Sequence, residues 1–109
     1  MAYNLRYSPL ALKDLDEIYD YIACRLENPS AADHTLDGIL SAIERLKEFP
    51  ETGAVLYSVL GMETDYRFII YKNYMAFYRH VENTVFIDRI IYGKRDYLRI
   101  LFAESDEDL

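Results

Sequence analysis

The sequence lacks the residues that most cross-links require. Cys24 is its single cysteine, so no internal disulfide and no cysteine-based zinc cluster can form. It has no apolar run of about 18 residues that could cross a membrane, and its first residues, MAYNLRYSPL, lack the apolar stretch of a signal peptide. We therefore expect a cytoplasmic protein that folds without a metal or cofactor and does not associate with membranes.

Basic side chains are also scarce. The chain has 12 Lys and Arg against 19 Asp and Glu, for a net charge of −7. The acidic residues concentrate in the first half and in the tail AESDEDL, whereas residues 61–102 carry slightly more basic than acidic side chains. This distribution permits a local anionic ligand but disfavours nonspecific binding to nucleic acid. For the tail, an acidic surface that merely aids solubility is an equally simple reading.

The size and composition predict one globular domain. A chain of 109 residues has room for one core, and 51% hydrophobic residues with 11 Tyr are typical of a folded protein. There is no internal repeat and no linker. We assign residues 1–102 to a single domain and residues 103–109 to an acidic tail.

The first half predicts a strand and two helices. Alternation over residues 3–7 indicates a short strand, and Ser8-Pro9 is a helix start with Ser8 as N-cap. The first helix has an apolar stripe of Ala11, Leu15, Ile18, Ile22 and Leu26. Its acidic residues, Asp14, Asp16, Glu17 and Asp20, are expected on the flanks and the outer face. It ends at Asn28-Pro29, because proline disfavours helical geometry in the residue before it.

The second helix is expected to have Ser30 as its N-cap, with Asp33 as the capping-box partner. Its stripe is Leu36, Ile39, Leu40, Ile43 and Leu46, with Phe49 beside it, and Pro50 ends it. Residues 51–63 carry two glycines without a clear period and are expected to be a loop. The short connection between the helices predicts an antiparallel hairpin.

The second half is rich in aromatic and β-branched residues, which favour strands over residues 66–71, 74–80 and 85–92. Short connections indicate an antiparallel meander. The fold class is therefore α+β, with the helical hairpin packed on one face of a sheet in the order β-α-α-β-β-β. We expect the other face of the sheet to be uncovered and available to a partner or nucleotide.

Four phrases in this order resemble the RelE/ParE family of bacterial type II toxins. They are SPLALKDLDEIYDYI, AIERLKEFPETG, YRFIIYKNYMAFYR and IDRIIYGKRDYL, and the resemblance as a whole extends from Tyr3 to about Phe102. The resemblance is closer to ParE-like proteins, through Arg67, Asn73-Tyr74 and Phe77-Tyr78. It implies the family's two-layer fold, with a short C-terminal helix in some members, and a toxin held inactive by a cognate antitoxin.

The resemblance implies two different cellular targets. ParE-like members act on DNA gyrase, whereas RelE-like members cut messenger RNA on the ribosome, and the shared fold cannot choose between them. Our first hypothesis is that the chain is the growth-arresting toxin of an addiction or plasmid-stabilisation module and that it acts by binding gyrase. A ribosome-dependent endoribonuclease is the alternative, and an attenuated toxin fold that survives as a partner-binding module is the third.

In the RelE-like pattern, metal-free RNA cleavage uses cations on the sheet. The resemblance carries over to Gly93, Lys94 and Arg95, with Arg95 at the position of the proposed general acid, and Arg67 is a second candidate. The phosphate-binding arginine of the pattern is replaced by Met75, and its two lysines on the preceding strand have no counterpart. These losses favour a protein-binding toxin over a nuclease. Arg67 and Arg95 are also compatible with surface ion pairs to Glu63, Asp65 or Asp96.

The remaining candidates have a structural and a functional interpretation. Tyr74, Tyr78 and Tyr92 are either the packing surface of the sheet or anchors for a base or a partner. For Arg89, we expect a structural role between neighbouring strands in preference to a catalytic role. Lys94 is expected to be solvated. His34 and His80 are expected to be ordinary surface histidines.

Overall fold

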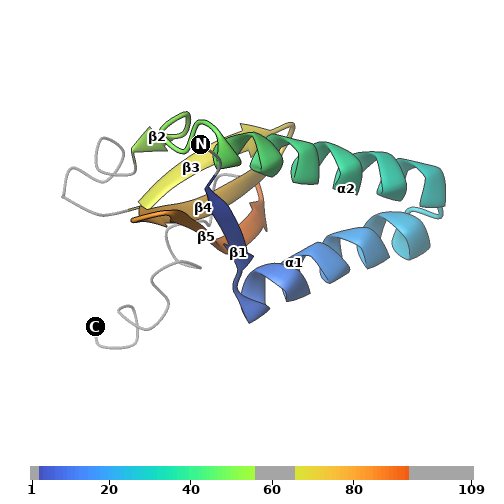
Figure 1. Ribbon diagram of the computed structural model, residues 1–109. Helices are drawn as coiled ribbons and strands as arrows, with labels where there is room; N and C mark the ends of the chain where they lie inside the picture. Colours follow the sequence, from blue (N-terminus) through green and yellow to red (C-terminus); the bar gives the residue numbers. More distant parts are fainter. Residues whose placement is uncertain (1–2, 56–65, 94–109) are drawn as a thin grey trace, which may run out of the picture.

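The computed structural model describes residues 3–55 and 66–93 (Figure 1). Several of our expectations fall outside the described residues. They are the acidic tail at 103–109, the domain boundary near residue 102, the short C-terminal helix implied by the resemblance, and the candidate residues Lys94 and Arg95. The described part consists of a helical hairpin packed against one mixed sheet. None of its helices is long and apolar enough to cross a membrane.

The sheet has five strands in the order β1-β5-β4-β3-β2. Strand β1 (Asn4–Tyr7) is parallel to β5 (Thr84–Tyr92), and β5 is antiparallel to β4 (Tyr74–Val81). Strand β3 (Tyr66–Tyr71) follows as an antiparallel neighbour of β4, and β2 (Ala54–Val55) pairs with the outer edge of β3. The predicted strands are confirmed within two residues at their ends. Strand β2 corrects our prediction, because we expected residues 51–63 to form only a loop.

The first helix, α1 (Pro9–Asp20), begins as predicted: the Ser8 hydroxyl accepts a hydrogen bond from the Ala11 amide. A π-helical turn, Tyr21–Arg25, continues it. The second helix, α2 (Pro29–Glu44), begins two residues before our expectation. Asn28 is its N-cap, accepting from the Ala31 amide, so the prediction of Ser30 is wrong. Pro29 explains the difference, because its fixed φ suits the first position of a helix.

The core lies between the hairpin and the sheet. Its buried members are Ala11, Leu15, Ile18, Ile22, Ala32, Ile39, Ile43, Leu46, Ala76, Tyr78, Val85, Ile87 and Ile90. Three predicted core residues are exposed, Leu26 at 56%, Phe49 at 63% and Leu40 at 36%. Leu26 lies at the far end of the hairpin, which projects beyond the sheet (Figure 1). Phe49 follows the 3₁₀ turn Arg45–Lys47, where the chain has already left the helix axis.

The second face of the sheet differs from our expectation. Tyr74 and Ala76 contact the core, so strand alternation places Met75 and Phe77 on the opposite face, and Ile91 is paired with Met75. These three residues are 3%, 0% and 6% exposed. The centre of this face is therefore covered, and the expectation of a bare surface there is wrong.

Gly38 allows α2 to pack closely on the sheet. A Cβ atom built at this position would overlap the hydroxyl and Cζ of Tyr71. We expect Gly38→Ala to lower the free energy of unfolding by about 1–2 kcal/mol, although alanine is the better helix former by about 1 kcal/mol. Urea unfolding measures the change. In a Tyr71→Ala background the sign should reverse, and a loss of the same size in both backgrounds would contradict the explanation.

Candidate functional site

The structure divides the five described candidate residues into two groups. Tyr74, Arg89 and Tyr92 line a cavity of about 490 Å³ between α1 and the ends of β4 and β5. Arg67 and Tyr78 instead meet at the segment 50–53, where the chain enters β2. Lys94 and Arg95 lie outside the described residues, so the roles expected for them stay predictions.

The cavity exists because β5 is longer than its neighbour. Strand β1 pairs with β5 only as far as Ile87, whereas β5 continues to Tyr92. A β-bulge at Asp88 also shifts the register against β4, since Phe77 pairs with Arg89 and Tyr78 with Ile87. The extra residue lets both Ile87 and Ile90 reach the core. The outer edge of β5 beyond Ile87 therefore faces α1 instead of a strand.

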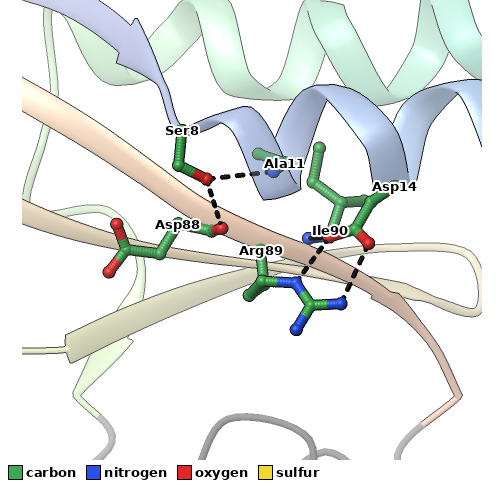
Figure 2. A network of polar contacts seen from close by, with 6 residues as sticks. All are labelled: Ser8, Ala11, Asp14, Asp88, Arg89 and Ile90. Carbon is green, nitrogen blue, oxygen red and sulfur yellow. Dashed lines mark hydrogen bonds and ion pairs between the residues drawn. The ribbon is translucent and has the colours of Figure 1, made fainter.

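The first turns of α1 satisfy the polar groups of this edge (Figure 2). The Ser8 amide donates to the Ile87 carbonyl at 2.9 Å, and its hydroxyl donates to the Asp88 carbonyl at 2.7 Å. Six residues later, Asp14 Oδ2 accepts from the Ile90 amide at 2.9 Å. Side chains of the helix thus replace the hydrogen bonds that a neighbouring strand would have supplied.

Asp14 also binds the guanidinium of Arg89. Its two carboxylate oxygens accept from Nε at 2.8 Å and from Nη2 at 3.0 Å (Figure 2). The hydrogen bonds to Asp14 raise the pKa of Arg89 above its usual value, so this arginine stays charged at all ordinary pH values. The structural interpretation of Arg89 is thereby supported, although its partner lies on the helix and not on a neighbouring strand.

Asp14 is the residue that our sequence reasoning misplaced. We expected it on the outside of the first helix, but it is 8% exposed. Position 14 lies three residues after Ala11 and four before Ile18, within the buried stripe. An aspartate inside an apolar stripe was the available signal, since a buried carboxylate requires a basic or amide partner.

The other side of the cavity is aromatic. The rings of Tyr74 and Tyr92 pack edge to face with their centroids 5.3 Å apart, and Tyr21 from the end of α1 lines the same space. Burial raises the pKa of Tyr74, and the neighbouring hydroxyls of Tyr92 and Tyr21 raise it further. The phenol of Tyr74 is therefore neutral near pH 7 and is suited to contact and hydrogen bonding, not to proton transfer.

The second group is a structural anchor. Tyr78 is 0% exposed, and its hydroxyl donates to the Pro50 carbonyl at 2.6 Å while accepting from the Gly53 amide at 3.0 Å. Arg67 Nη1 donates to the Gly53 carbonyl at 3.0 Å. Of the two interpretations of Tyr78, packing is the one that the structure supports. The same bonds place Arg67 against the backbone of the segment that leads into β2.

The third arginine of these strands, Arg79, was not among our candidates. It extends between the rings of Tyr66 and Phe86, each 5.9 Å from its guanidinium carbon, and its Nε lies 3.3 Å from Asp88 Oδ2. Each arginine of β3, β4 and β5 therefore donates to an acceptor of its own chain. Among the described residues, no cluster of His, Cys, Asp or Glu is positioned to hold a metal.

The comparisons with known proteins agree with this geometry. Residues 5–97 match the model of a family described as the ParE toxin of the type II toxin–antitoxin system parDE. A search of curated proteins found no match. A structure of a chromosomal ParDE toxin–antitoxin system from P. aeruginosa is similar, with a TM-score of 0.71 and 23% identity over 85% of this chain and 98% of that one.

A second similar structure is the toxin–antitoxin complex RelBE2 from Mycobacterium tuberculosis. Its TM-score is 0.62, with 20% identity over 84% of this chain and 99% of that chain. At these identities the two structures establish the common α+β fold, in which two helices pack on a mixed sheet. They leave the cellular target open, because one comes from a ParDE system and the other from a RelBE complex.

Proposed function

The chain belongs to the ParE toxin family of type II toxin–antitoxin systems, and on this premise we propose that it arrests growth by binding a protein target such as DNA gyrase. A cognate antitoxin holds it inactive. Recognition of a protein target requires an accessible surface of defined shape and no acid–base pair. The cavity between α1 and β5, with its exposed tyrosines, supplies such a surface.

The observation that carries this proposal is that the arginines of β3, β4 and β5 are already hydrogen-bonded within the chain. Arg67, Arg79 and Arg89 each donate to an acceptor of the same chain. The position at which the nuclease pattern has a phosphate-binding arginine is Met75, which is 3% exposed. Each phosphate contact that is missing weakens RNA binding, so β3 and β4 are poorly equipped to hold a scissile phosphate.

A ribosome-dependent endoribonuclease remains the second candidate, on the strength of the sequence Gly93-Lys94-Arg95. In that case Arg95 would serve as the general acid, and Arg67 would release the Gly53 carbonyl to contact phosphate. The two candidates therefore make opposite predictions about Arg95. A third outcome, in which the chain binds an antitoxin without harming the cell, corresponds to an attenuated toxin.

Controlled expression of the chain in bacteria tests this proposal. We expect growth arrest with an early DNA-damage response and altered plasmid supercoiling, while translation continues at first. Arg95→Ala should leave the arrest intact, and co-expression of the product of the neighbouring gene should abolish it. Primer extension on messenger RNA is the second measurement. Ribosome-dependent cuts in messenger RNA that disappear in Arg95→Ala would overturn the gyrase hypothesis in favour of the endoribonuclease. Normal growth on full expression would support the attenuated toxin.

A further inference from the structure

The cavity between α1 and the end of β5 has an uncompensated negative charge. Of its two acidic residues, Asp14 is neutralised by Arg89 through two hydrogen bonds. Glu17 lies one turn further along α1, is exposed and lines the same cavity. Among the described residues, no hydrogen bond or ion pair occupies its carboxylate. After the hydrogen bond and charge of Asp14, the negative charge of Glu17 also raises the pKa of Arg89.

Besides Glu17, the cavity offers aromatic faces and phenol oxygens. Tyr21 and Tyr92 are 52% and 64% exposed, and Tyr74 packs against the core. The ring of Tyr21 already attracts one cation, since the guanidinium carbon of Arg25 lies 5.8 Å from its centroid. Aromatic rings attract cations through their electron-rich faces, and phenol oxygens accept hydrogen bonds from them.

Part of the cavity lining is aliphatic. Ile18, Ile90 and Ile91 line it together with the tyrosines and Glu17. A long basic side chain has a matching distribution of chemistry, because its methylene stem packs on apolar surface while its charged end remains near water and acceptors. A carboxylate or phosphate would instead face Glu17 without a free cation in the described wall, and a purely aliphatic side chain would leave Glu17 unpaired.

We propose that this cavity is a docking pocket for an arginine or lysine side chain of a partner protein, with Glu17 as the ion-pair acceptor and Tyr21, Tyr74 and Tyr92 as the aromatic walls. The partner is identified as the antitoxin only through the proposed function. The pocket itself depends on the residues described here. Arginine is the better occupant, because its planar guanidinium can stack on a tyrosine ring and donate to a carboxylate at the same time.

The test uses the full chain and small probes. Nitrogen-15 labelled protein is titrated with N-acetyl-L-argininamide, its uncharged analogue N-acetyl-L-citrullinamide, and N-acetyl-L-leucinamide. We expect saturable shifts of the amides of Tyr21, Ile91 and Tyr92 with the arginine probe, and at least about fivefold weaker binding of the two neutral probes. Equal or tighter binding of the leucine probe would overturn the proposal in favour of an apolar anchor.

Matched variants separate the pocket charge from the general acidity of the chain. Glu17→Gln should weaken the arginine probe about fivefold or more, whereas Asp16→Asn, on the same helix and exposed, should leave it within about twofold. Equal losses in both variants would show nonspecific attraction to a chain of net charge −7 and would refute the pocket. Tyr92→Leu, which keeps apolar contact but removes the ring, should also weaken the probe. None of these titrations requires growth arrest, so a failed toxin assay and a failed pocket are distinguishable.

Discussion

Asp14→Ala is expected to lower the free energy of unfolding by about 3–5 kcal/mol, because it leaves a buried ion pair without one partner. The carboxylate accepts three hydrogen bonds, two from Arg89 and one from the Ile90 amide. Its removal leaves a guanidinium that is only 23% exposed without its counterion, and a buried amide without an acceptor. Both groups then lose hydration without compensation. Equilibrium unfolding in urea measures the change.

Two further variants locate the cause of that loss. Asp16→Ala removes the same charge from an exposed position of α1 and should change stability by less than about 0.5 kcal/mol. The double variant Asp14→Ala with Arg89→Met should recover part of the loss, because no unpaired guanidinium remains. If the double variant is less stable than the sum of the single changes, the charged pair is not the source of the effect.

Tyr78→Phe is expected to cost about 3 kcal/mol although it removes one oxygen atom. That oxygen forms hydrogen bonds with two backbone groups, the Pro50 carbonyl and the Gly53 amide, which lie 28 and 25 positions before Tyr78 in the sequence. The side chain is fully buried, so water cannot replace either bond. The segment 50–53 should consequently loosen together with the pairing of β2 to β3, and hydrogen exchange at the Gly53 amide should accelerate.

Tyr92→Phe is the appropriate control, since it removes the same atom from a side chain that is 64% exposed and should change stability by less than about 0.5 kcal/mol. Thermal and urea unfolding of both variants provide the comparison. A loss below about 1 kcal/mol in Tyr78→Phe would mean that the two backbone groups find other partners. The tyrosine would then contribute through the packing of its ring alone.

Local features of the fold were predictable from sequence because their causes are local. Ser8-Pro9 starts α1 through a contact across three residues, and the strands of the meander follow from β-branched and aromatic runs. The start of α2 was ambiguous, since Asn28 and Ser30 are both good N-caps and the position of Pro29 decides between them. Strand β2 was missed because its pairing depends on β3 and not on its own two residues.

The site was less predictable because it depends on contacts across long sequence separations. Tyr74, Arg89 and Tyr92 were candidates because of their residue types, and Asp14, Glu17 and Tyr21 line the same cavity only through the packing of α1 on β5. The partners Asp14 and Arg89 are 75 positions apart. The β-bulge at Asp88 that brings Ile90 to Asp14 has no mark in the local pattern. The same limitation explains why a sheet face expected to be bare has buried residues at its centre.

The parallel pairing of β1 with β5 has a consequence for the order in which the molecule can be assembled. Asn4 is aligned with Thr84, and β5 lies between β1 and β4 in the sheet. A nascent chain that has been synthesised only as far as β4 has no partner for its first strand and no edge for Asp14 to bind. Completion of the sheet therefore waits until residues near 90 have left the ribosome. The first strand therefore reaches its native pairing only after β5, the last described strand of the sheet, has been synthesised.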